Sequence, residues 1–179
     1  MNPVHFIRDR LALYASELKN LGIAPDNGER QNFFFGPSIE FSDVLVEAIR
    51  NKAVYPALVL EYPDNAIDDN NQTGMVEKLN FGISVISNVS PRNNSKTDVE
   101  GIIYGTCKPL VDQVIARLQL ESDGRDLREE CLFELSLESN YTGMWVGPLL
   151  NNVYGFRYNV SFRAYTNALK YNPMMWTVP

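Results

Sequence analysis

The chain has 179 residues, 45% of them hydrophobic and 21% charged, which suffices for one domain with a sizeable core. Its formal net charge of -6 argues against general nucleic-acid binding, because that function needs a basic face. The two cysteines, Cys107 and Cys131, are far apart and flanked by apolar residues, which excludes a disulfide framework and a zinc spacing and favours a reducing compartment.

The domain organisation predicted from the sequence is simple. Residues 1–166 are expected to form a single α+β domain, and residues 167–179 an apolar C-terminal tail. The chain has no apolar signal core and no run of about 18 apolar residues, so we expect no membrane association. We expect the protein to stay in the cytoplasm where it is made, unless it leaves as part of an assembly.

The N-terminal part predicts two helices on either side of an aromatic segment. Residues 3–21 carry an apolar stripe at helical spacing, and residues 43–52 form a shorter helix of the same kind. Three consecutive aromatic residues, Phe33, Phe34 and Phe35, cannot all face one core from a single short strand. Either this strand is buried on both faces, or one ring reaches a neighbouring subunit.

Two strands are expected next, with a polar loop between them. Residues 55–62 form a short apolar run bounded by prolines, and residues 78–89 alternate apolar with polar side chains, which is typical of a half-buried strand. The loop at 63–74 holds the densest acidic cluster, and a calcium site is one interpretation. The spacing of Asp64, Asp68 and Asp69 does not match a calcium-binding loop, so a solvated hairpin loop is favoured.

Residues 97–120 predict a long amphipathic helix, with Thr97 or Asp98 at its N-cap. Gly105 and Pro109 interrupt its regular pattern, because proline removes one backbone hydrogen bond in a helix interior. Either the helix kinks between these residues, which we favour, or its regular part begins at Pro109.

The C-terminal part predicts two further strands, at residues 131–138 and 155–165, with an apolar loop or broken strand at 141–148. Arg157 and Arg163 alternate with apolar residues and face outward on the last strand. They can bind phosphate, but outward arginines on a strand are more often paired with carboxylates or placed in an interface. We therefore expect an antiparallel sheet of about four strands, with the long helix and the N-terminal helix on one face.

No residue pattern points to catalysis, cofactor binding or metal binding. Nucleophile-elbow, phosphate-loop, dinucleotide-binding and Cys/His metal patterns are missing, and Cys107 and Cys131 are interpreted as small core residues. We therefore expect no catalytic, cofactor or metal residues and a protein that is not an enzyme. The candidate contact residues for subunits or partners are instead aromatic, arginine and methionine side chains: Phe33, Phe34, Phe35, Trp145, Arg157, Arg163, Met174, Met175 and Trp176.

The expected element order is helix, short helix, strand, strand, long helix, strand, strand. With the ending GFRYNVSFRAY and the preceding loop that holds Gly147, Pro148 and Asn151-Asn152, it resembles the ring-forming tail terminator and head–tail joining proteins of tailed bacteriophages. The chain departs from that pattern in its acidic loop at 63–74 and its apolar tail, which leaves the position of the ring open.

The resemblance implies a structural virion protein, assembled in the host cytoplasm, whose subunits pair edge to edge into a homo-oligomeric ring. Its partners are then adjacent neck, portal or tail proteins, and DNA passes through the lumen without specific binding. The alternative is a non-enzymatic module that binds a small ligand or a regulator in a pocket under the long helix.

Overall fold

A computed structural model describes residues 3–23, 28–38, 43–69, 75–90, 95–123, 136–138 and 141–165 of the chain. The elements along these residues are, in order, α1 (Pro3–Glu17), β1 (Gln31–Gly36), α2 (Asp43–Lys52), β2 (Ala53–Glu61), β3 (Asp64–Asp69), β4 (Met75–Asn88), α3 (Lys96–Ile102), the π-helical turn η1 (Ile103–Cys107), α4 (Lys108–Asp123), β5 (Ser136–Leu137), β6 (Thr142–Leu149) and β7 (Val153–Tyr165). The predicted α+β class is confirmed.

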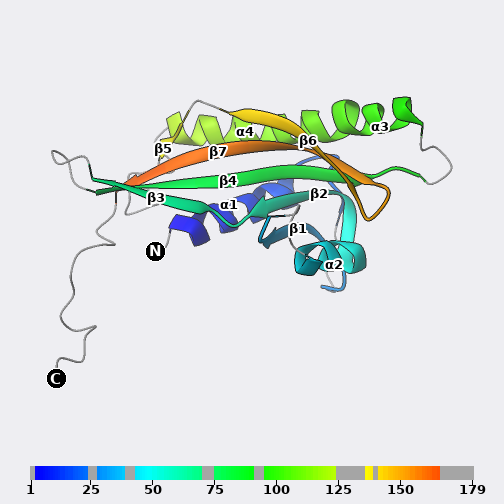
Figure 1. The fold of residues 1–179 in the computed structure, drawn as a ribbon, viewed down its shortest axis with the longest axis horizontal. Helices are drawn as coiled ribbons and strands as arrows, with labels where there is room; N and C mark the ends of the chain where they lie inside the picture. The colour runs from blue at the N-terminus through cyan, green and yellow to red at the C-terminus, as the bar shows by residue number, and fades with distance from the viewer. Residues whose placement is uncertain are drawn as a thin grey trace, which may run out of the picture.

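Two long antiparallel strands, β4 and β7, form the middle of the sheet and run along the long axis of the molecule (Figure 1). Shorter strands pair with them on either side. β2 and β3 both pair with β4, β6 and β5 both pair with β7, and β1 lies outside β2. The sheet therefore has seven strands among the described residues rather than the expected four, and it is mixed, because β1 runs parallel to β2.

Three differences from the expected strands have local causes. Half of the supposed loop at 63–74 is β3, whose polar residues gain backbone bonds by pairing with the first half of β4. Residues 142–149 form β6 despite two glycines and a proline, because an edge strand tolerates them. Of the strand expected at 131–138, only β5 and the residue after it lie within the described residues.

One face of the sheet is covered by α1 and by the α3–η1–α4 helix, as expected. Apolar residues from both helices join alternate residues of β2, β4 and β7 in one core; those buried to the greatest extent include Ile7, Leu11, Val111, Leu118, Leu58, Phe81, Val160 and Phe162. The rings of Phe81 and Phe162 meet edge to face, at 5.8 Å between centroids. This burial is the main favourable contribution to folding.

The opposite face is covered only in part. At one end of the sheet α2 packs over a second core that contains Phe34, Leu45, Ile49, Val59 and Ile86 (Figure 1). Beyond α2 the residues on this face turn from apolar to polar. The sheet is therefore buried on both faces at one end and open on one face further along.

The aromatic segment at 33–35 forms part of β1 and packs its rings on both faces of the sheet, with Phe34 buried and Phe33 and Phe35 partly buried, which favours the first of the two alternatives. Phe34 faces the core under α2, whereas Phe33 and Phe35 pack against the core under α1. The rings serve opposite faces because successive side chains of a strand point in opposite directions.

The long helix is continuous, and a π-helical turn stands where a kink was expected. In η1 the N–H of Lys108 bonds to the carbonyl of Ile103, one residue further back than in an α-helix. The widened turn immediately precedes Pro109, whose ring clashes with the carbonyl four residues back in a regular helix. The helix is capped by Ser95, with Asp98 completing a capping box, rather than by Thr97 or Asp98.

Ion pairs join α1 to α4 on the helical face. Arg10 contacts Glu121 at 2.8 Å, and Arg117 contacts both Glu17 at 2.5 Å and Glu121 at 3.1 Å. Burial alone raises the pKa of Glu121, but contacts with Tyr14 and with the two guanidinium groups lower it below its ordinary value. Glu121 thus acts as a negatively charged link between the two helices.

This link predicts a specific acid sensitivity. Because the folded-state pKa of Glu121 is lowered, its carboxylate stabilises the fold above the ordinary pKa of 4.5, and that stabilisation is lost as the pH falls through the folded-state pKa. In urea unfolding at several pH values, Glu121→Gln should lower the unfolding midpoint at pH 7 and reduce its decline below pH 4.5. Glu100→Gln, at a more exposed site in α3, serves as the control and should change neither. An unchanged acid profile for Glu121→Gln would contradict the assignment.

Candidate functional site

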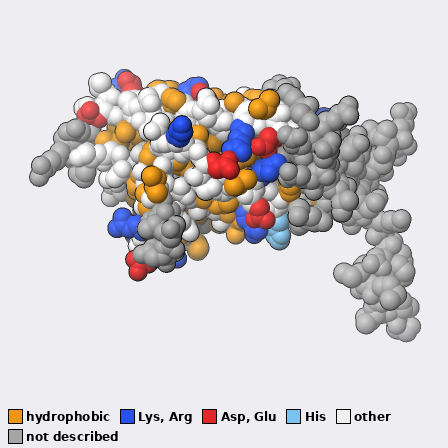
Figure 2. Space-filling view, turned by 180° about the vertical axis from the view of Figure 1, so that it is seen from behind, with side chains coloured by type: hydrophobic (Ala, Val, Ile, Leu, Met, Phe, Trp, Pro, Cys, Tyr) orange, Lys and Arg blue, Asp and Glu red, His pale blue; other side chains and the backbone are white. Residues whose placement is uncertain are grey.

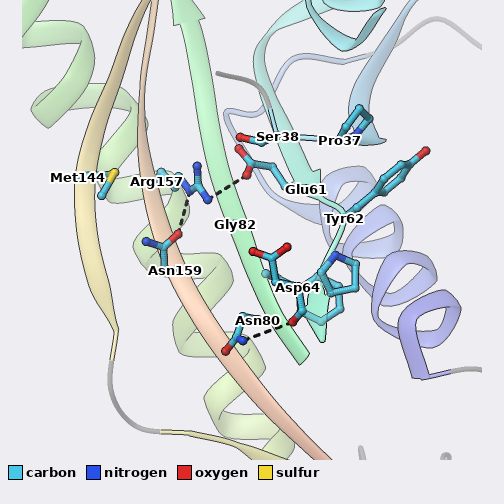
Figure 3. A pocket seen from close by; sticks show the side chains of 12 residues that line it. Pro37, Ser38, Glu61, Tyr62, Asp64, Asn80, Gly82, Met144, Arg157 and Asn159 are labelled. Carbon is cyan, nitrogen blue, oxygen red and sulfur yellow. Dashed lines mark hydrogen bonds and ion pairs between the residues drawn. The ribbon is translucent and has the colours of Figure 1, made fainter. Parts of the chain in front are cut away.

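A hollow of about 660 Å³ opens on the uncovered part of the sheet, on the face opposite α1 and α4 (Figure 3). Its floor is formed by residues of β2, β4 and β7, one wall by the segment after β1, and the other wall by β6. The residues that line it are Pro37, Ser38, Glu61, Tyr62, Pro63, Asp64, Asn80, Phe81, Gly82, Met144, Arg157 and Asn159.

An ion pair between Glu61 and Arg157 lies at the floor of the hollow. Glu61 ends β2 and Arg157 lies on β7, so the pair reaches across the intervening strand β4 (Figure 3). The Oε2 atom of Glu61 lies 2.9 Å from Nη2 of Arg157, and the two side chains are only 3% and 16% exposed. The Nε–H of Arg157 also donates to Oδ1 of Asn159 at 2.9 Å.

Gly82 makes this contact possible. A Cβ atom at position 82 would lie 2.7 Å from both Arg157 Nη2 and Glu61 Oε2, which is closer than a Cβ atom comes to a non-bonded heavy atom in proteins. The missing side chain therefore leaves the space through which the pair closes over β4. Glycine within a strand often marks such a close approach.

The net contribution of this pair to stability is the small difference between a desolvation cost and an electrostatic attraction. Removing two charges from water costs several kcal/mol for each ion, and mutual attraction compensates only when the geometry is good. Here Arg157 gains a carboxylate partner and an amide partner at once. The pair holds side chains of β2 and β7 in fixed positions across β4, but stability alone does not require charged residues at such a place.

The rim of the hollow is partly aromatic and partly polar. The ring of Tyr62 is exposed and packs edge to face on Phe35, at 4.8 Å between centroids. Asn80 donates to the backbone carbonyl of Asp64 at 3.3 Å and accepts a hydrogen bond from Ser161 at 2.6 Å. These contacts fix the lower end of the site.

Arg163 lies further along the same face, outside the hollow. It contacts Glu138 at 2.6 Å, and Lys78 contacts the same carboxylate at 2.8 Å. The pKa of Glu138 is lowered, chiefly by the hydrogen bond from Lys78 and then by Arg163, although burial opposes the shift. Both outward arginines of β7 therefore have carboxylate partners, as the commoner interpretation predicted.

The strand β6 presents a different surface at the edge of the sheet. Among the described residues it pairs with β7 alone, so its outer edge has no strand beside it. Trp145 is 55% and Met144 is 40% exposed. They point to opposite faces: Met144 lines the hollow, whereas Trp145 borders a groove formed with Tyr104, Pro148 and residues of α3 and η1.

The other candidate residues have varied positions. Phe34 is buried inside its own chain, and Phe33 and Phe35 are partly buried. Met174, Met175 and Trp176 lie outside the described residues. Cys107 is buried beside the carbonyl of Tyr154, and burial raises the pKa of its thiol to about 12, so it is a core residue rather than an activated nucleophile.

Within the part of the chain that the structure describes, no group of three or more His, Cys, Asp or Glu side chains is arranged to hold a metal ion. None of the helices in that part combines the length and apolar character needed to cross a bilayer. The residues that the sequence did not single out are Glu61 and Gly82. The sequence held two signals for them: Glu61 is a charge at the end of an apolar strand, and Gly82 is a glycine within an alternating strand.

The chain matches no protein-family model and no curated protein.

The buried pair predicts an asymmetric response to substitution. Arg157→Met should lower the free energy of unfolding by about 3–5 kcal/mol, because it leaves the charge of Glu61 buried without this partner. Adding Glu61→Leu should restore most of the loss, since the double variant buries no charge at this point. Both are measured by urea unfolding at one fixed protein concentration.

Lys96→Met is the control, because Lys96 forms an exposed pair with Glu100 at 3.7 Å and its loss should cost less than about 1 kcal/mol. A double variant no more stable than Arg157→Met alone would contradict the account of the pair.

Proposed function

We propose that this protein is a structural virion protein of a tailed bacteriophage. It forms a homo-oligomeric ring in the neck or tail, in a tail terminator or head–tail joining role. Its partners are further copies of itself and adjacent neck, portal or tail proteins, and the protein is not an enzyme. The proposal rests on the open edge of β6, on the charge of the chain, and on the resemblance of the expected element order, to which the structure adds β1, β3 and β6.

The observation that carries the proposal is the edge of β6. Proteins usually protect an edge strand with charged side chains, because an open edge pairs with strands of other chains. The sequence of β6 is TGMWVGPL, which contains no charged residue, and its proline and its register shift lie in the second half, between Val146 and Leu149. Its exposed Met144 and Trp145 lie on opposite faces of the edge, so a strand added there would gain backbone hydrogen bonds and apolar contacts on both faces.

The distribution of charge supports a lumen through which DNA passes without specific binding. The net charge is -6, and the described basic side chains of α1 and α4 stand next to acidic ones (Figure 2). Surfaces of this kind do not attract phosphate over long distances, whereas a DNA-binding face needs clustered lysine and arginine.

The alternative role of a small-ligand module, with its pocket under the long helix, has less support. The described residues between that helix and the sheet are packed: Cys107, Val111, Val114 and Leu118 are almost fully buried against β4 and β7. The hollow with polar groups lies on the other face of the sheet.

The ring is tested by native mass spectrometry and negative-stain electron microscopy of the purified protein. We expect closed rings of one defined stoichiometry. Trp145→Glu should raise the dissociation constant more than about tenfold, because a charge replaces an apolar contact in the interface. Val44→Glu is the matched control, since Val44 is also exposed, at 78%, but lies on helix α2 rather than on the outer edge of β6.

A stable monomer at high concentration would contradict the proposed function. Rings that tolerate Trp145→Glu would leave the ring in place but contradict the role of β6.

A further inference from the structure

We propose that the hollow above the Glu61–Arg157 pair binds a neutral carbohydrate, of the size of a mono- or disaccharide. This site is distinct from the ring interface proposed above, because the hollow lies within one chain and shares only Met144, in its β6 wall, with that interface. Three features of the hollow lead to this ligand class: its volume, its mixture of hydrogen-bonding groups and its aromatic rim.

The size of the hollow is appropriate. Its volume of about 660 Å³ lies within the range of about 300–1,000 Å³ that is typical of small-molecule sites. The hollow is open to solvent at the top, so a sugar enters without any movement of the sheet. Its floor is held rigid by three paired strands and by the ion pair, which lowers the entropic cost of binding.

The polar groups around the floor combine donors with acceptors. Arg157 has five N–H groups, and the described contacts with Glu61 and Asn159 use two of them. The NH₂ group of Asn159 and the carboxylate of Asp64 have no partner among the described residues. Sugar hydroxyls donate and accept hydrogen bonds at once, so they can satisfy such a mixed set.

Charged ligands fit this set less well. The lining carries two carboxylates, Glu61 and Asp64, and one guanidinium, Arg157. The carboxylates repel an anion that approaches Arg157, whereas a cation at the floor lies next to the guanidinium of Arg157 and competes with it for Glu61. A neutral ligand with many hydroxyls avoids both penalties.

The rim provides an apolar surface for the C–H face of a sugar ring. The ring of Tyr62 is 54% exposed and lines the hollow with Pro37 and Pro63. Figure 3 shows the Tyr62 side chain directed away from the Glu61–Arg157 pair, so its ring lies at the outer rim of the hollow rather than over the floor. Contacts with such a ring contribute affinity beyond simple area burial.

The test uses the full-length protein in its purified state of assembly. Saturation-transfer NMR and calorimetry are run with glucose, galactose, mannose, N-acetylglucosamine, maltose, cellobiose and lactose, each at about 10 mM, a concentration that detects dissociation constants near 1 mM. Citrate and spermidine serve as anionic and cationic probes. We expect saturable binding of at least one neutral sugar and none of the two charged probes.

Matched tyrosine variants locate the site. Tyr62→Ala should weaken binding about tenfold, and Tyr62→Phe should preserve it, because the ring remains. Tyr104→Ala removes an equally exposed ring, at 53%, from the groove beside Trp145 and should have no effect.

The proposal is overturned if no neutral sugar binds, if only citrate or spermidine binds, or if binding survives Tyr62→Ala. Ring assembly is measured separately, by mass spectrometry and imaging. An absence of sugar binding therefore does not contradict the ring, and an absence of rings does not contradict sugar binding.

Discussion

Thirteen consecutive residue pairs join β4 to β7, from Val76–Tyr165 to Asn88–Val153. This ladder is longer than any other strand pair in the described structure. The other described strands pair with the outer side of β4 or of β7, except β1, which pairs with β2. Side chains alternate between the two faces along both strands, and the pairing register places apolar residues of the two strands on the same face. The ladder therefore has two faces with different chemistry. On one face Phe81, Val85, Phe156 and Phe162 bury themselves under the helices. On the other, Ile86 and Val153 belong to the core under α2, and glycine and polar residues follow further along.

The features proposed as functional are consequences of that ladder. Glu61 meets Arg157 because β2 ends beside the middle of β4, where Gly82 leaves the face open. The hollow exists because α2 covers only the far end of this face. The open edge exists because β6 pairs with β7 along one side and, in the described structure, no strand pairs with its other side. The hollow and the edge of β6 are therefore both built on the β4–β7 ladder. Residues on such paired strands are positioned more precisely than residues on loops.

Local periodicity explains which parts of the fold were predictable. The strands at 78–89 and 155–165 and their inward faces followed from alternation, and the helices followed from apolar spacing, because each pattern depends only on neighbouring residues. The parallel pairing of β1 with β2 did not follow, since no local signal encodes which strands meet. β3 was missed because its polar sequence, DNAIDD, lacks the apolar residues that mark a buried strand. The Glu61–Arg157 contact was missed because it joins residues almost a hundred positions apart, and no local pattern marks such a contact.

Amide hydrogen exchange shows whether subunits assemble along β6. Exchange is measured for the assembled protein and for a form dissociated by dilution, with β4 and β7 as internal references. If subunits assemble along β6, its amides that are not bonded to β7 exchange slowly in the assembly and rapidly after dissociation, while β4 and β7 stay protected in both forms. Equal exchange of β6 in the two forms, with new protection confined to another surface, would contradict it.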